Sequence, residues 1–279
     1  LVQPTSGMVR VAGHDVQHDG VTARQQIGYL PQRAVLYANL TVAENLAFLA
    51  QIRNVGQARI AETIELFHLE EIVDRPARVL SDGMVQRLGL AQSLLADPPI
   101  LVLDEPTVSL DPPSVAVFKA LLRDLHMAGK TVLLASHILG DVQELSDRVA
   151  ILDQGRLVAL DSVAGLARRC ALLERLWIDL AEVSGSEADL ARRAGAEMAA
   201  LRGPSLEIAV PRERKLAVMQ ALLAGGIAIR DFHSQAPTLE AIFSQLVGSA
   251  ATTDDRRLTT DSHDPEASGR WSIAGGRPS

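Results

Sequence analysis

Aromatic side chains are scarce in this chain: Phe, Trp and Tyr make up 3% of its 279 residues, although 47% are hydrophobic. A core must therefore be built mainly from Leu, Val, Ile and Ala. The single cysteine, Cys170, excludes an internal disulfide framework and a cysteine-based zinc site, and it fits a reducing cytoplasm. No run of about 18 apolar residues occurs, so we expect no segment to span a bilayer by itself.

Positive charge is not in excess either. The formal net charge is -7, which argues against a general nucleic-acid binder, because such proteins usually present a basic surface. The length is sufficient for one large or two modest domains with their own cores.

Short aliphatic runs alternate with helical spacing over the first 165 residues. Strands are expected at 8–11, 27–30, 100–103, 131–135, 149–152 and 156–160, and helical segments at 41–95, 115–125 and 139–145. Thr41 and Glu44 have the spacing of a capping box at the start of the first helical segment. The run at 100–103 follows two prolines and is typical of a strand covered on both faces. This alternation predicts a doubly wound α/β sheet.

The pattern changes after about residue 165. Strands are expected at 176–180, 206–210 and 227–230, helices at 188–194 and 215–224, and a last helix at 239–246. This predicts a small α+β accessory domain over 166–247. From residue 248 onward Thr, Asp, Ser, Gly, Arg and Pro dominate, so we expect a disordered tail over 248–279.

The strongest chemical signal is the pair Asp104-Glu105 at the end of the aliphatic run 100–103. Open α/β sheets bind ligands at the carboxyl ends of their strands. One carboxylate there can hold Mg²⁺, and the other can orient or deprotonate a water that attacks a phosphate. By itself the pair is equally consistent with two solvated acids at the start of a turn.

Five segments together resemble the ATP-binding-cassette (ABC) ATPase family, and they occur in the family's order over most of residues 1–160. Tyr29-Leu30-Pro31-Gln32 resembles the Q-loop, Leu80-Ser81-Asp82-Gly83-Met84 the signature motif, Asp104-Glu105 the Walker B motif, Ser109-Leu110-Asp111 the D-loop, and His137 the switch histidine. A helical insertion separates the Q-loop from the signature motif, as in the family.

The resemblance implies a role for each matching residue. Asp104 and Gln32 would hold Mg²⁺, Gln32 and Glu105 would contact or activate the attacking water, and His137 would donate a hydrogen bond to the γ-phosphate of ATP. The signature residues Ser81, Gly83 and Met84 would contact a nucleotide held by an opposite subunit, and Asp111 of the D-loop would also bind nucleotide. Ser81 and the amide of Gly83 precede a helix whose N-terminus can complement phosphate charge.

The sequence departs from the family pattern at two places. Asp82 stands in the signature motif where the family usually has Gly, and its carboxylate would repel a triphosphate unless it points away. No G-x-x-x-x-G-K-[ST] occurs; the partial match Gly129-Lys130-Thr131 follows a helix and precedes a strand, which is the reverse of a P-loop. The segment 1–7 resembles the end of the helix that follows the P-loop. We therefore expect the P-loop strand to lie upstream of Leu1 in a truncated chain that is inactive alone; the alternative is a natural P-loop-less pseudo-ATPase.

The predicted fold is thus an α/β P-loop NTPase core over 1–165 without its P-loop strand, with a helical signature subdomain at about 33–95. The segment 231–243 resembles the tail of exporter ATPases that pair with a separate membrane subunit. The expected partners are a transmembrane permease and a second copy of the ATPase, with no nucleic acid and no membrane contact except through the permease. The resemblance places the protein in the cytoplasm, at the inner face of the cell membrane. Less expected alternatives are a non-catalytic regulatory subunit and an ABC ATPase of translation or DNA repair.

A second cluster of polar residues precedes the Q-loop: His14, Asp15, His18 and Asp19. These residue types can ligate metals, but a polar turn after the strand at 8–11 is the favoured interpretation.

Overall fold

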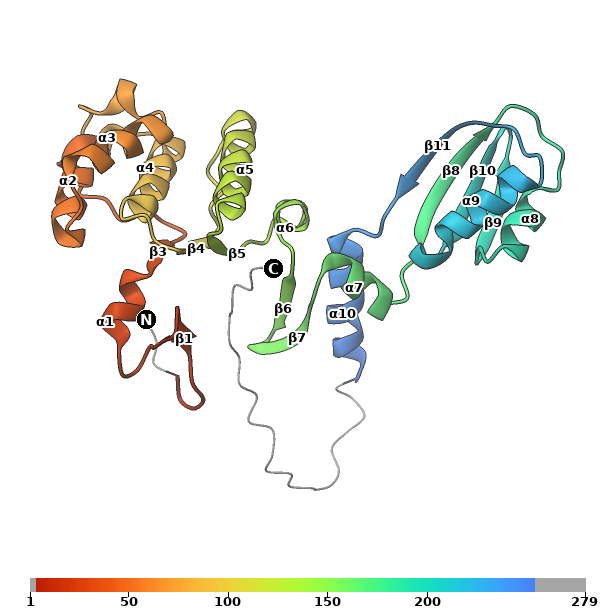
Figure 1. The fold of residues 1–279 in the computed structure, drawn as a ribbon, viewed down its shortest axis with the longest axis horizontal. Helices are drawn as coiled ribbons and strands as arrows, with labels where there is room; N and C mark the ends of the chain where they lie inside the picture. The colour runs from red at the N-terminus through yellow and green to blue at the C-terminus, as the bar shows by residue number, and fades with distance from the viewer. Residues whose placement is uncertain (1–3, 254–279) are drawn as a thin grey trace. The chain divides into compact units, whose positions relative to one another are not determined.

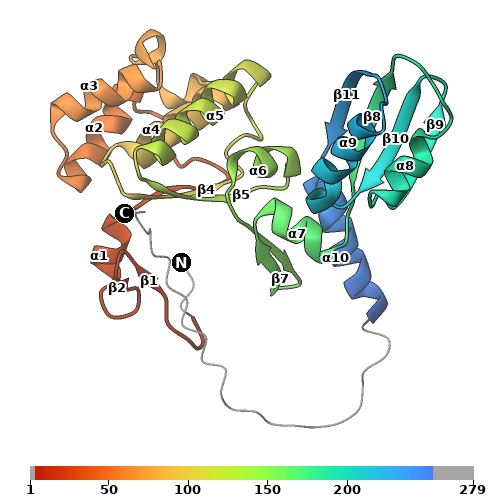
Figure 2. The ribbon, with the colours of Figure 1, turned by 45° about the vertical axis from the view of Figure 1, so that its right-hand side comes forward.

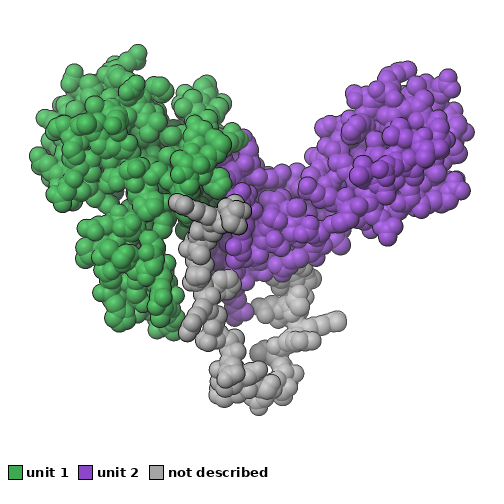
Figure 3. Space-filling model, in the orientation of Figure 1, with its two compact units in different colours: residues 1–137, 261–279 green, residues 138–260 purple. Residues whose placement is uncertain are grey.

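The computed structural model describes the backbone of residues 4–253 and the side chains of residues 4–247. The chain divides into two compact units (Figure 3). Their described parts, residues 4–137 and 138–253, are named unit 1 and unit 2. Among the described residues, no helix is both long and apolar enough to cross a membrane.

Unit 1 combines a small parallel sheet with a group of helices. Its strands are β1 (Arg10–Val11), β2 (His14–Asp15), β3 (Ile27–Leu30), β4 (Ile100–Asp104) and β5 (Thr131–Ala135). Its helices are α1 (Gly20–Gln25), α2 (Val42–Arg53), α3 (Gln57–Leu66), α4 (Asp82–Leu94) and α5 (Pro112–Met127), with 3₁₀ turns at Glu70–Ile72 and Ala77–Val79. Strands β3, β4 and β5 form the parallel sheet in that order, and β1 pairs with β2 in a hairpin.

Helix α4 packs closely against β3, and two glycines make this possible. A Cβ atom on Gly28 would collide with the carbonyl oxygen of Ser93, and one on Gly89 would lie 2.8 Å from Leu30 Cδ1. The two backbones can approach this closely only because neither position carries a side chain. Figures 1 and 2 show α4 and α5 on the same side of the sheet. The strand side chains buried most completely are Leu30, Leu101 and Leu103.

The other face of this sheet is more open. Tyr29 pairs in register with Val102, and Val102 with Leu133, so these apolar side chains form one row across three strands. Tyr29 is 53% exposed and Leu133 is 57% exposed. The sequence predicts that residues 100–103 are covered on both faces, whereas within unit 1 burial alternates along β4 because the described helices pack on one side.

The predicted helical region 41–95 is divided into α2, α3 and α4 with the two 3₁₀ turns between them. Its predicted capping box is confirmed, because Thr41 Oγ1 accepts from the Glu44 amide at 3.2 Å and Glu44 Oε2 accepts from the Thr41 amide at 2.8 Å. Arg59 of α3 donates to the carbonyls of Leu94 and Leu95, which lie at the end of α4. Carbonyls at a helix end lack intrahelical partners, so this contact joins α3 to α4.

Unit 2 contains a hairpin group and a separate sheet. The hairpin strands are β6 (Val149–Asp153) and β7 (Arg156–Asp161), and the helices beside them are α6 (Leu139–Leu145), α7 (Val163–Arg169) and α10 (Leu239–Thr253). Their common core includes Val142, Ile151, Leu166, Leu239 and Ile242. Gln245 Nε2 also donates to the carbonyl of Cys170 at 2.9 Å. The last helix of the described chain therefore packs with segments that are far from it in sequence.

The sheet of unit 2 follows a β-α-β-β-α-β pattern. Its elements are β8 (Glu174–Leu180), α8 (Glu187–Arg193), β9 (Met198–Arg202), β10 (Ser205–Val210), α9 (Lys215–Ala224), preceded by a 3₁₀ turn at Arg212–Arg214, and β11 (Ile229–Gln235). The strand order is β11-β8-β10-β9, and every neighbouring pair is antiparallel. Helices α8 and α9 contribute to a core with one face of this sheet (Figure 2). This is the split β-α-β arrangement of ferredoxin-like domains.

Most predicted elements are confirmed, and β3, β5, α6 and α9 have the predicted bounds. Strand β9 was not predicted, because Met198–Arg202 contains two alanines and no β-branched residue. Helix α10 runs to Thr253, into the segment 248–279 for which the sequence predicts disorder. Residues 254–279 lie outside the described residues.

The division between the compact units falls at His137 and Ile138, whereas the sequence predicts a domain boundary near 165. The two positions differ because α6, the hairpin and α7 share a core with α10. The domains 1–165 and 166–247 remain a prediction, with bounds that differ from those of the compact units.

Replacing Gly28 by Ala should destabilise unit 1 by about 1–3 kcal/mol, because the added methyl group cannot fit between β3 and α4. Chemical denaturation followed by circular dichroism measures this loss. Gly140→Ala is the matched control, since a Cβ there meets nothing within 4 Å and the position is helical. Equal midpoints for the two variants would show that the close approach of α4 to β3 does not constrain the fold.

Candidate nucleotide-binding and catalytic site

Glu105 directly follows β4 and Ser136 directly follows β5, so both lie at the same edge of the sheet. Glu105 comes after Asp104, and its φ of 49° lies in the left-handed region that non-glycine residues seldom adopt. This conformation turns the chain while the Glu105 amide donates to the carbonyl of Ala135 at 2.8 Å. Backbone strain of this kind costs roughly 1–3 kcal/mol and persists only where surrounding contacts impose it.

The Glu105 carboxylate is held by the residues that follow β5. It accepts hydrogen bonds from Ser136 Oγ at 3.2 Å and from the His137 amide at 3.0 Å, and His137 Nδ1 lies 2.8 Å from it. Because an ionised carboxylate can only accept, His137 Nδ1 is the donor in this pair. The Glu105 side chain is 15% exposed and that of His137 is 72% exposed. A shielded carboxylate thus stands beside an imidazole whose other nitrogen can reach solvent or a ligand.

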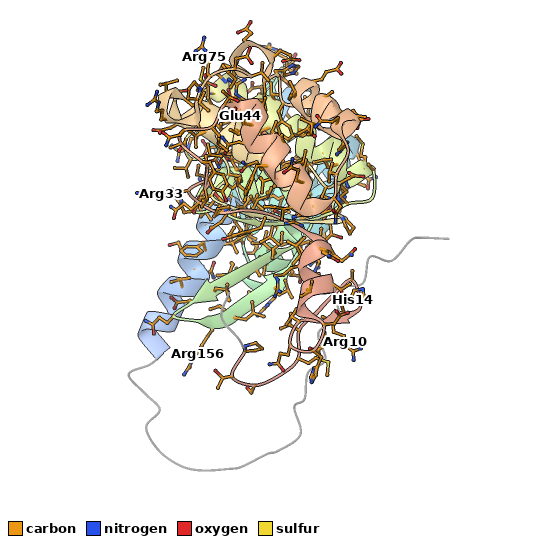
Figure 4. All side chains as sticks on the ribbon, turned by 90° about the vertical axis from the view of Figure 1, so that its left-hand side faces the viewer. Arg10, His14, Arg33, Glu44, Arg75 and Arg156 are labelled. Atoms are coloured by element: carbon orange, nitrogen blue, oxygen red, sulfur yellow. The ribbon has the colours of Figure 1, made fainter. Side chains whose placement is uncertain are left out.

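Gln32 lies at the same edge of the sheet. The parallel register pairs Leu30 with Leu103, so the segment after β3 emerges beside the end of β4. Gln32 is exposed, and Arg33 after it projects away from the ribbon (Figure 4). The topology therefore brings three of the predicted residues, Gln32, Asp104 and Glu105, to one edge of the sheet.

The predicted Mg²⁺ ligands are Asp104, half-buried at the end of β4, and Gln32. Within the described residues, no group of three or more His, Cys, Asp and Glu side chains is arranged to hold a metal. One carboxylate and one amide still fit Mg²⁺, which usually keeps several waters and takes oxygens from substrate phosphates. The assignment of these two residues as ligands remains a prediction.

The predicted signature residues form the N-terminus of α4. Ser81 is the N-cap, and its Oγ accepts from the Met84 amide at 3.4 Å. Gly83 lies in the first turn, where a Cβ would be 3.5 Å from the carbonyl oxygen of Ser109. Asp82 is the first residue of the helix and is exposed. The helix N-terminus, with its partial positive charge, therefore faces the loop that follows β4.

Gln86 links these two parts of the site, a role that its sequence position does not indicate. Its side chain is buried, and Nε2 donates to the carbonyl of Pro106 at 3.1 Å. Pro106 directly follows Glu105, so this bond joins the loop that carries the predicted catalytic carboxylate to α4. In the sequence, Gln86 continues the segment that resembles the signature motif, two residues after Met84.

Asp111 of the predicted D-loop is the N-cap of α5, and its Oδ1 accepts from the Ser114 amide at 2.8 Å. Hydrogen bonds from Ser114, and secondarily the positive charge of Arg87, lower the pKa of Asp111 below its ordinary value. The structure thus shows a helix-capping role for Asp111. Its contact with nucleotide remains a prediction.

The alternative candidates are held in structural contacts. Lys130 Nζ lies 2.7 Å from Asp97 Oδ1 and donates to the carbonyl of Pro98 at 2.9 Å, so it fastens the start of β5 to the segment before β4. His14 Nδ1 lies 2.7 Å from Asp19 Oδ2 in the β1–β2 hairpin region (Figure 4). His18 forms a similar pair with Asp15 at 3.3 Å. These contacts agree with the interpretation of the segment as a polar turn.

Carboxylates at the ends of parallel strands, together with a helix N-terminus, are features of an α/β protein that can bind a phosphorylated ligand. The ABC transporter family matches residues 1–108. The daunorubicin resistance ATP-binding protein DrrA3 of Streptomyces coeruleorubidus is 32% identical over 277 residues, which cover 92% of this chain and 82% of that protein. The Nod factor export ATP-binding protein I of Cupriavidus metallidurans is 32% identical over 255 residues, covering 89% and 81%.

Solved structures agree with these relatives. A structure described as the ATP-binding subunit of an ABC transporter superposes with a TM-score of 0.57 at 26% identity, covering 61% of this chain and 72% of that chain. A dimeric ATP-binding cassette bound to ADP and Pi superposes with a TM-score of 0.53 at 24% identity and supports the fold alone; it covers 58% of this chain and 75% of its own. The chain therefore belongs to the ABC transporter family, as an ATP-binding subunit.

Substituting Asp111 by Ala should lower stability at neutral pH, and the difference from wild type should disappear in acid. Because the folded pKa is lowered, the cap stabilises fully above the ordinary Asp range near pH 4 and is lost as pH falls through the folded pKa. Urea unfolding of both proteins between pH 3 and 7 measures the difference. Asp111→Asn is the control, since Asn also caps helices and does not titrate. A difference that stays constant down to pH 3 would contradict this account.

Proposed function

We propose that this chain is the ATP-hydrolysing subunit of an ABC exporter and acts with a separate transmembrane permease. The observation that carries the proposal is the Glu105–His137 pair at the end of β4 and β5, held at 2.8 Å. Relatives that are described as resistance or export ATP-binding proteins support the exporter class. The cargo would be selected by the permease.

In the proposed reaction, Glu105 orients the attacking water and accepts its proton, because its carboxylate is shielded and already fixed by Ser136 and His137. His137 Nε2 would donate toward the γ-phosphate only in the protonated imidazolium, because Nδ1 already donates to Glu105. Asp104 and Gln32 would hold Mg²⁺, which would supply charge stabilisation to the phosphates. Each residue is placed by a strand end, so the geometry depends on the sheet rather than on a long loop.

The signature residues are proposed to act on a nucleotide held by a second copy of the subunit. Ser81, Gly83 and Met84 offer the N-terminus of α4, which suits a phosphate. In this arrangement ATP closes two subunits around two nucleotides, and hydrolysis reopens them. Asp82 would face the same phosphates, so its exposed carboxylate is expected to weaken closure.

An exposed apolar patch beside the Q-loop supports the permease partner. Val35 is 80% exposed, Ile52 is 60% exposed, and the rings of Tyr37 and Phe48 contact edge to face at 4.7 Å. Buried Asn45 fixes Tyr37 by accepting from its amide and donating to its carbonyl. Apolar patches of this kind mark protein contacts, and a coupling helix of a permease is the proposed partner.

A second candidate is a non-catalytic regulatory subunit. The observation that favours it is the absence of G-x-x-x-x-G-K-[ST] from the sequence, because this loop is the usual phosphate cradle. The described residues supply a catalytic carboxylate, a histidine and a helix N-terminus but not that cradle. The experiment on Glu105 separates the two candidates.

Glu105→Gln should lower ATP hydrolysis by about 100-fold or more in the transporter complex purified from cells, because an amide cannot accept the proton of water. Phosphate release at saturating MgATP measures the rate. Glu65→Gln, on the exposed surface of α3, is the matched control and should hydrolyse ATP at the wild-type rate. A complex that hydrolyses no ATP with either residue would favour the regulatory subunit, and unchanged hydrolysis in Glu105→Gln would refute the role of Glu105.

Val35→Asp should reduce the amount of permease that co-purifies with the chain, because it places a charge in the exposed apolar patch. Quantitative pull-down of the permease from solubilised membranes measures this. Val117→Asp on α5 is the control, since Val117 is also an exposed valine, at 59%. Equal recovery with both variants would place the permease contact elsewhere.

A further inference from the structure

The sheet of unit 2 has one face without a helix. Helices α8 and α9 pack on the face that carries Leu176, Ile178 and Leu180. Side chains of the opposite set alternate with these along β8, and they are Arg175, Trp177 and Asp179. This helix-free side is named the open face.

The strand register arranges the open face in three rows. The central row contains His233, Trp177, Glu207 and Ala200; one outer row contains Gln235, Arg175, Ala209 and Met198; and the other contains Asp231, Asp179, Ser205 and Arg202. The Trp177 ring stacks on that of His233 with centroids 5.7 Å apart. Ala200 in the same row, and the diagonal neighbours Ala209 and Ser205 on β10, are small and leave room for an approaching surface. A half-buried tryptophan at the centre of such a face is a typical anchor of a protein interface.

The charges of the open face are separated along the strands. Arg175 lies two residues before Trp177 on β8 and Asp179 lies two residues after it, and both are exposed. Neither forms an ion pair with any residue of the described chain. Asp179 is also directly paired with Asp231 in the register, and like charges placed opposite each other on a sheet are destabilising. The face therefore has an unpaired positive end and an unpaired negative end, with an aromatic centre.

We propose that the open face is an interface with the open face of a second copy of this chain. A two-fold axis that runs across the strands along the Trp177 row keeps each strand opposite its own copy and exchanges the two outer rows. Arg175 of one copy then faces Asp179 of the other, twice, and the two Trp177 rings meet at the axis. Antiparallel sheets pack face to face at about 10 Å in a nearly aligned orientation, which suits this arrangement.

One like-charge contact accompanies this symmetry, because Glu207 would face Glu207 of the second copy. Arg202 of the same copy already offsets it, since Arg202 Nε lies 3.1 Å from Glu207 Oε2. The mixed charge of the face also disfavours a nucleic acid, which would need a consistently positive surface. The charges of the open face are thus complementary to those of the same face in a second copy, and this property favours a second copy as the binding partner.

The face consists of four short strands, so the interface is small. We expect a weak dimer with a dissociation constant of roughly 10 μM to 1 mM. Two ATPase subunits on one transporter would raise the local concentration enough to form it, and this last step rests on the proposed function. The proposed contact between two isolated chains does not depend on the proposed function.

The test measures association of the full chain without nucleotide, by sedimentation velocity from about 10 μM to 1 mM. Wild type is expected to dimerise over this range. Arg175→Asp and Asp179→Arg should each raise the dissociation constant at least about tenfold, because each creates two like-charge contacts. An equimolar mixture of the two variants should dimerise again, since every Asp then faces an Arg.

Arg193→Asp is the matched control: it makes the same charge change at an exposed site on α8 and should leave association unchanged. In a Trp271→Phe background Trp177 is the sole tryptophan, and its emission should shift to the blue as wild type associates. A monomer at every concentration, or a variant mixture that does not associate, would overturn the proposal. Neither result would alter the hydrolysis assigned to Glu105, because Glu105 lies in unit 1 and the open face lies in unit 2.

Discussion

The close approach of α4 to β3 constrains the arrangement of the rest of unit 1. Gly28 and Gly89 let a helix backbone lie where side chains would otherwise separate it from the sheet. The N-terminus of α4, capped by Ser81, is thereby set beside the loop after β4, and Gln86 joins the two through the Pro106 carbonyl. Packing of apolar surface and placement of the nucleotide-facing residues therefore have the same physical cause.

The catalytic residue proposed here occupies an unfavourable backbone conformation. Glu105 has a positive φ, and hydrogen bonds from Ser136 and His137 to its carboxylate offset the strain. All of these residues follow parallel strands β4 and β5, whose register Asp104–Ala135 fixes the distance between the two ends. A rigid sheet edge thus holds the acid and the histidine together without a ligand.

Unit 2 has two hydrophobic cores that serve different purposes. The core of the hairpin group includes Leu239 and Ile242, so α10 closes on residues that precede the sheet in sequence. The other core lies between the sheet and α8 with α9, and it leaves the open face uncovered. The helices bury one face of the sheet and stabilise it, whereas the other face presents Trp177 and unpaired charges. Such a face is suited to contact with another protein.

How much the sequence predicts depends on whether the relevant forces are local. The bounds of β3, β5, α6 and α9, and the capping box at Thr41, follow from periodicity and from side chains that bond their own backbone, so they were predictable. Three of the five family-like segments, those that resemble the Q-loop, the Walker B motif and the switch histidine, likewise contain the residues that lie at the sheet edge. Strand β9 was not predictable, because neighbouring strands stabilise it against the low strand propensity of its alanines.

Tertiary structure alone decided the remaining features. The roles of Gln86 and Lys130, the left-handed backbone of Glu105 and the return of α10 to the hairpin group all depend on partners distant in sequence. No local pattern encodes such contacts, because they arise only when packing brings the partners within bonding distance. The sequence by itself determined the residue types and the family of the site, and the packed sheet determined which of them meet.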